Sequence, residues 1–178
     1  MHTHDAREPI IAAFVLALVA VAAHGQESPP AQAEALAGLT GIRVDVTLSA
    51  PPTLHLKADA LRRIMIERLG LNGVPMLAGK DIAPDSGDPV LTADVVVATV
   101  DAGCTFRVRL YVVELANLAR RADSPGGAPR PARAVTWWGG IYFNGNDEVG
   151  RCIRGVNESV LHAVDAFTNG FHQANRGL

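Results

Sequence analysis

The chain carries several polar side chains of the types that enzymes use, and two of them are spaced to act together. His162 and Asp165 lie three residues apart in a segment with helical periodicity, so both project from one helix face. A carboxylate at this spacing can orient an imidazole, and an oriented imidazole is a general base for hydrolysis. His55 and Asp59 are further candidates for the same chemistry. A hydrolase is therefore one hypothesis, although an exposed helix pair without catalytic function is the favoured explanation of His162 and Asp165.

Motifs that would identify a phosphate, metal or nucleophile site are incomplete. Gly79-Lys80 is not followed by the serine or threonine of a phosphate-binding loop. The spacing of Asp81, Asp85 and Asp88 does not match an EF-hand. The chain contains no His-x-x-x-His, Cys-x-x-Cys or Gly-x-Ser-x-Gly motif. We therefore predict no cofactor and no metal site, and we assign no catalytic residue.

The N-terminal segment has the features of a secretory signal peptide. Residues 10–23 form an unbroken apolar run of signal-peptide length, whereas a membrane span needs about 20 residues. Ala23 and Gly25 are small residues at the −3 and −1 positions of a cleavage site after Gly25. We predict that residues 1–25 are a signal peptide, that the protein is periplasmic or secreted, and that no integral membrane span remains after cleavage. A retained membrane anchor is the alternative.

Charge and cysteine content restrict the partners and the redox state. The formal net charge of −2 argues against a general nucleic-acid binder. Fourteen of the sixteen basic residues are arginines, a bias typical of high-GC bacterial genomes. In an oxidising compartment two cysteines are more often bridged than catalytic, so we predict a disulfide between Cys104 and Cys152. Two buried free thiols are the alternative.

The strongest pattern predicts a long amphipathic helix over residues 149–171. Seven apolar residues recur at helical spacing on one stripe: Val149, Ile153, Val156, Val160, Val164, Phe167 and Phe171. The opposite face is polar and carries Arg151, Arg154, Glu158, His162, Asp165, Asn169 and His172. We expect the apolar stripe to pack on a layer formed by the preceding residues.

The residues that precede this helix are predicted to form several strands and one further helix. The predicted strands cover residues 42–48, 74–77, 90–100, 105–112 and 134–143, and the further helix covers residues 58–69. Gly70 suits the left-handed position that ends this helix, with Leu71 making the accompanying apolar contact. The apolar parity switches at Val113, which predicts a β-bulge or an edge where the strand bends. Residues 144–147 have the composition of a turn and supply caps for the last helix.

The predicted fold is α+β, with an antiparallel four- to five-stranded sheet and two helices packed on one face, in the order β-α-(β)-β-β-β-α. The predicted organisation is a signal peptide over residues 1–25, a flexible leader over 26–39 and a single domain over 40–176. Placing both helices on one face leaves the other face of the sheet open. That face would present Arg43, Asp45, Arg107, Arg109 and Tyr111.

Trp137 and Trp138 are the most distinctive pair in the strands. Adjacent strand residues point to opposite faces, so one tryptophan should enter the core and the other should lie on the open face. An outward tryptophan beside two arginines and a tyrosine has the composition of a binding surface. We therefore predict a binding site formed from Arg107, Arg109, Tyr111, Trp137 and Trp138. Packing of the outer tryptophan under a loop is the alternative.

The sequence also resembles uncharacterised exported bacterial proteins. The resemblance is carried by residues 39–46, by residues 61–74 with Gly70, by residues 110–121 and by the Trp137-Trp138 strand. In layout alone, the chain is similar to small envelope accessory proteins of lipid-transport and outer-membrane assembly systems. Those proteins are commonly lipoproteins, whereas this chain has no lipidation cysteine after its apolar run. The resemblance implies a binding role in the cell envelope.

These features together predict an exported, non-catalytic accessory or binding protein of the bacterial cell envelope, with an envelope protein as its partner. Two alternatives remain. A small-ligand carrier would need an apolar cavity between the sheet and the helices. A hydrolase would need several polar side chains at hydrogen-bond distance in a concave site.

Overall fold

The computed structural model describes residues 34–77, 87–100, 103–118, 130–146 and 148–176. The predicted signal peptide, most of the predicted leader and the loop residues 78–86 and 119–129 lie outside them. The elements follow in the order β1 (Arg43–Ser49), a 3-10 turn η1 (Pro52–Leu54), α3 (Ala58–Leu71), β2 (Val90–Val100), β3 (Gly103–Leu118), β4 (Arg130–Asn146) and α4 (Val149–Ala174).

The strands form one four-stranded sheet in the order β1-β2-β3-β4. The predicted α+β class is confirmed, but the prediction of a fully antiparallel sheet is wrong, because β1 and β2 run parallel. Helix α3 lies between these two strands in the sequence and returns the chain to the end where β1 began, as a parallel crossover requires. The weak strand predicted at 74–77 is present only as an isolated bridge from Ile42 to Met76.

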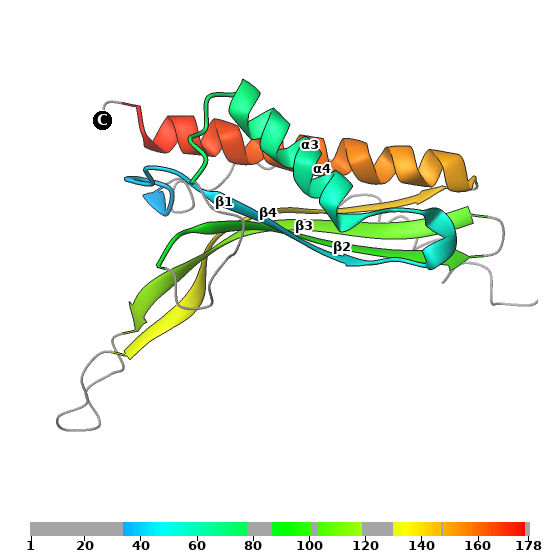
Figure 1. Cartoon of the computed structure of the whole chain (residues 1–178), viewed down its shortest axis with the longest axis horizontal. Helices are drawn as coiled ribbons and strands as arrows, with labels where there is room; N and C mark the ends of the chain where they lie inside the picture. The colour runs from blue at the N-terminus through cyan, green and yellow to red at the C-terminus, as the bar shows by residue number, and fades with distance from the viewer. Residues whose placement is uncertain (1–33, 78–86, 101–102, 119–129, 147, 177–178) are drawn as a thin grey trace, which may run out of the picture.

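Both helices cover the same face of the sheet, as predicted (Figure 1). Helix α3 packs on β1, and α4 packs on β3, β4 and α3. The core lies between the two layers and includes alternate residues of the central strands: Leu91, Ala93, Val95, Val108, Leu110 and Val112. Because successive strand residues point to opposite faces, the residues between these form the face that neither α3 nor α4 covers.

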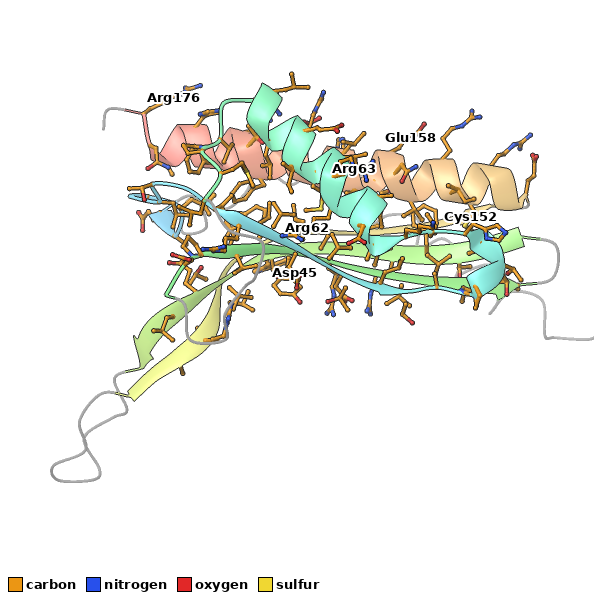
Figure 2. All side chains as sticks on the ribbon, in the orientation of Figure 1. Asp45, Arg62, Arg63, Cys152, Glu158 and Arg176 are labelled. Carbon is orange, nitrogen blue, oxygen red and sulfur yellow. A yellow bond between two sulfur atoms is a disulfide. The ribbon has the colours of Figure 1, made fainter. Side chains whose placement is uncertain are left out.

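Helix α4 confirms the amphipathic pattern of residues 149–171. Val156, Val160, Val164 and Phe167 are fully buried, whereas Glu158 is exposed on the outer side of the helix (Figure 2). The turn predicted over residues 144–147 is wrong. The backbone of residues 144–146 continues β4 and pairs with residues 104–106 of β3. Ladder hydrogen bonds to β3 thus override the turn propensity of these polar residues, and Glu148 rather than Asn144 or Asn146 precedes the helix.

Helix α3 is two residues longer than predicted and ends on a different glycine. Gly73 has a positive φ of 73°, whereas Gly70 lies within the helix. The amide of Val74 donates to the carbonyl of Leu69, and that of Gly73 donates to Gly70, which together form a Schellman motif. Val74 is buried in the apolar contact of this motif, and Leu71 is exposed instead.

The predicted disulfide between Cys104 and Cys152 is confirmed, with 6.1 Å between the two Cα atoms. It joins the start of β3 to the first turn of α4, and both cysteines are buried. The bond closes a loop over a sequence separation of 48 residues, so the chain-entropy model gives about 4 kcal/mol of stabilisation.

The segment that precedes β1 contributes to the core. Leu36 is fully buried and its Cδ1 lies close to Gly170 of α4. The side chain of Asn175 accepts a hydrogen bond from the amide of Gly38 at 2.9 Å and donates to the carbonyl of Leu36 at 3.0 Å. Residues 36–38 are thereby attached to the C-terminal end of α4.

Candidate binding surface

The candidate site lies on the sheet face opposite the helices, which we call the open face. It is formed by alternate residues of the strands, and Asp45 of β1 points to this side of the sheet (Figure 2). The strand register places Asp45, Thr92, Tyr111 and Trp138 in one row across the four strands. Thr47, Asp94 and Arg109 form the adjacent row.

A charged cluster occupies the centre of the open face. Arg109 and Asp94 are directly opposite each other on β3 and β2, and the Arg109 guanidinium donates to Oδ2 of Asp94 at 2.6 and 3.1 Å. Arg107 donates to the same oxygen at 3.1 Å. Two guanidinium groups thus share one carboxylate, so the cluster has an excess of one positive charge. Its arginines remain accessible, with side-chain exposures of 35% for Arg107 and 44% for Arg109.

An aromatic and aliphatic area adjoins this cluster along β3 and β4. Tyr111 pairs with Trp138 across the two strands, and Trp138 is 48% exposed. Val135 and Leu115 continue the area and are 57% and 43% exposed. Exposed apolar side chains beside a polar cluster are typical of interaction surfaces.

The two tryptophans point to opposite faces, as predicted. Trp137 is fully buried and its ring meets that of Phe167 of α4 edge to face. It therefore belongs to the core and not to the surface of the predicted binding site. Arg107, Arg109, Tyr111 and Trp138 share the open face.

Irregular pairing of β4 shapes this surface. The register shifts between Arg109 and Tyr111 and again between Val112 and Val113, near the position predicted from the sequence, but the extra residues lie in β4 and not in β3. Bulges bend a strand and increase its twist. Beyond Val113 the hairpin of β3 and β4 has no further partner in β2, and it projects away from the helices (Figure 1).

Gly139 lies at the first of these irregularities for a steric reason. A Cβ atom at this position would lie 2.8 Å from Cη2 of the Trp137 ring. The absence of a side chain therefore lets the indole fold back over the backbone of its own strand. This glycine therefore allows the burial of Trp137.

Sequence reasoning missed parts of the open face. In the sequence, Asp94 is a single polar residue within an apolar strand, which does not predict a binding role. It becomes part of the charged cluster because the strand register places it opposite Arg109. Val135 follows from a β4 bulge, which keeps Val135 and Trp138 on one face although they are three residues apart. Leu115 lies on this face because it continues the alternation of Arg109, Tyr111 and Val113 along β3. Arg43 lies at one corner, where its Nε donates to Asp88 at 2.8 Å.

The catalytic candidates lie in two separate places, with Asp165 bound to the end of α3 and His55 and Asp59 around its start. Arg68 of α3 binds the Asp165 carboxylate through two hydrogen bonds of 2.7 Å, and Asn72 adds a third at 3.3 Å. The hydrogen bonds from Arg68 lower the pKa of Asp165, against the opposing effect of partial burial. Asp165 therefore joins the two helices. His55 and Asp59 are exposed around the start of α3. Among the described residues, no group of three or more potential metal ligands is present.

A shallow depression at the C-terminal end of α4 is lined by Asn169, His172, Gln173, Asn175 and Arg176. Its polar groups already hold the fold together. His172 Nε2 lies 2.7 Å from the carbonyl oxygen of Asn72, to which it donates, and Asn175 binds residues 36 and 38. These polar groups are thus already engaged within the protein, whereas the arginines of the open face remain accessible.

Comparison with known proteins gives no relative. No protein family, no curated protein and no solved structure matches this chain. None of the described helices is both long and apolar enough to cross a membrane. The function is therefore inferred from the geometry of the open face.

Proposed function

We propose that this protein is an exported, non-catalytic accessory protein of the bacterial cell envelope that binds a protein partner through its open face. The observation that carries the proposal is the shared Asp94 carboxylate with its two accessible arginines, next to the exposed ring of Trp138. Arginine, tryptophan and tyrosine are the side chains that most often dominate protein interfaces.

The surface is also well positioned for binding. Its residues project from hydrogen-bonded strands, and Asp94 holds Arg107 and Arg109 in place before any partner arrives. Side chains that are already ordered lose less conformational entropy on association. A partner therefore gains more net affinity from these arginines than from mobile surface residues.

Export is supported by two independent features. The N-terminal apolar run with small residues at the cleavage positions is typical of a signal peptide. The buried disulfide between Cys104 and Cys152 is compatible with an oxidising compartment. Cleavage after Gly25 is part of the proposal.

The two alternative functions have less support. In the described part of the chain, the Trp137 and Phe167 rings occupy the space between sheet and α4 where a carrier would hold its ligand. A hydrolase that uses His162 and Asp165 would have to release Asp165 from Arg68. Neither requirement applies to a binding protein.

The proposal is tested by crosslinking in living cells. A photoreactive residue replaces Arg109, and a matched variant carries it at Glu158 on the outer side of α4. We expect one dominant envelope protein to be captured from position 109 and not from position 158. Equal capture from both positions, or no protein adduct from position 109, would contradict the proposal.

A further inference from the structure

We infer that the partner contributes an acidic amphipathic helix, which lies along a strip of β3 and β4 on the open face. This inference rests on the proposed function and specifies the chemistry of the partner. The docking strip consists of Arg107, Arg109, Tyr111, Val113 and Leu115 of β3 with Val135 and Trp138 of β4.

The middle of the docking strip is apolar. Tyr111 pairs with Trp138, and Val113 pairs with Val135, so four side chains from two strands form one continuous area. Two of them, Val135 and Trp138, are about half exposed, and Leu115 extends the area along β3. This arrangement suits a partner with an apolar stripe.

Positive charge lies at one end of the apolar area. Arg107 and Arg109 share the single carboxylate of Asp94, which leaves an excess of one positive charge there, and both side chains remain accessible. This end of the strip is therefore net positive, and its electrostatic complement is acidic.

The length of the strip favours a helix as the docking element. Arg109 and Leu115 are six residues apart on β3, which corresponds to about 20 Å. A helix of about 13 residues spans this distance. Helices pack on sheet faces through a single apolar stripe, as α3 and α4 do on the other face, whereas a partner strand would pair at the β4 edge.

The inference is tested with synthetic peptides and the purified chain with its disulfide intact. The probe is a helical peptide of about 14 residues with leucines at i, i+3, i+4 and i+7 and glutamates beside this stripe, clustered at the end that meets Arg107 and Arg109. The control has the same leucines and lysine in place of every glutamate. Binding is followed by peptide anisotropy and by tryptophan emission. The chain contains two tryptophans, and the Trp138→Phe variant assigns the change to the exposed one.

We expect the acidic peptide to bind with a blue shift of Trp138 emission, and the lysine peptide to bind at least about tenfold more weakly. The double variant Arg107→Gln, Arg109→Gln should abolish this preference, because it removes the excess positive charge of the strip. Arg154→Gln on the exposed side of α4 is the matched control and should preserve it. Circular dichroism of every variant shows that differences do not arise from unfolding.

Equal affinity for both peptides, a preference unaffected by the arginine substitutions, or no binding at millimolar peptide would overturn the inference. Self-association of the chain that is lost in Arg109→Gln would overturn it as well, because a second copy would then occupy the strip. If crosslinking from position 109 still captures one envelope protein, only the acidic helix is excluded. If that capture also fails, the proposed function fails with it.

Discussion

Trp137 of β4 and Phe167 of α4 meet edge to face, with 5.2 Å between their ring centroids. Both side chains are fully buried, and they join the sheet to the long helix at the strand that also carries the exposed Trp138. The indole N–H of Trp137 has no hydrogen-bond acceptor among the described residues. This contact is thus stabilised by packing and ring geometry rather than by hydrogen bonding.

The two tryptophans should therefore differ in their effect on stability. Trp137→Ala should lower the free energy of unfolding by about 3–5 kcal/mol, because it removes a fully buried aromatic ring. Trp138→Ala should change it by less than about 1 kcal/mol, because that side chain is half exposed. Urea denaturation measures both. Equal losses would contradict the assignment of Trp137 to the core.

Gly139→Ala tests the close approach of the indole to its own strand. The added Cβ would lie 2.8 Å from the Trp137 ring, so the ring or the strand must move. We expect a loss of about 1–3 kcal/mol in the free energy of unfolding, as for other overpacked core positions. Gly38→Ala is not a suitable control because Gly38 has a positive φ. Gly150→Ala lies at an exposed helical position where the added Cβ would be 3.8 Å from Oε1 of Glu148, an ordinary contact, and it should not destabilise the protein.

Removal of the disulfide tests the constraint on β3 and α4. The double variant Cys104→Ala, Cys152→Ala should be about 4 kcal/mol less stable, since its unfolded chain is no longer cross-linked. Denaturing alkylation of the wild-type protein should modify no thiol, and prior reduction should expose two. Two modified cysteines without reduction would exclude the bond in solution.

The ion pair between Arg68 and Asp165 predicts a pH dependence of stability. Hydrogen bonding to Arg68 lowers the pKa of Asp165 in the folded protein, so this carboxylate stabilises the fold above its unfolded pKa of about 3.9. The contribution is lost as the pH falls below about 4 through the folded pKa. It is modest because both side chains are partly exposed. The difference in unfolding free energy between wild type and Asp165→Asn should shrink from pH 6 to pH 2.5, whereas the difference for Glu158→Gln should stay near zero.

The apolar stripe of α4 is tested by a pair of substitutions. Val164 is fully buried, so Val164→Asp places an unpaired charge in the core and should abolish soluble expression. Glu158→Ala changes an exposed position and should be nearly silent. Solubility after lysis distinguishes the two. Equal tolerance of both substitutions would contradict the packing of this helix.

The sequence predicted what depends on local periodicity. The seven-residue stripe of α4, the alternation in β1 and β3 and the opposite orientation of Trp137 and Trp138 are each properties of a short segment. Periodicity does not encode which strand pairs with which or in what direction. The parallel pairing of β1 with β2 and the long β4 through Asn146 were therefore missed.

The sequence predicted only part of the binding surface, because local periodicity does not show how strands pair. Arg107, Arg109 and Tyr111 share parity within one strand, so their common face could be read from spacing. The contact from Asp94 depends on the register of two strands, and the position of Val135 depends on a bulge. Tertiary pairing decides both, and a single sequence gives no measure of it.

The hydrogen bonds of Asn175 have a consequence for the connectivity of the domain. They attach the end of α4 to residues 36 and 38, so the described domain begins and ends at one corner. A circular permutant can therefore join position 176 to position 34 through a short linker without stretching the chain. New termini in the connection between α3 and β2 would place β1 and α3 after α4 in sequence, and we expect β1 still to pair with β2. If such a permutant folds, the fold does not depend on whether β1 and α3 are synthesised before or after the remaining elements.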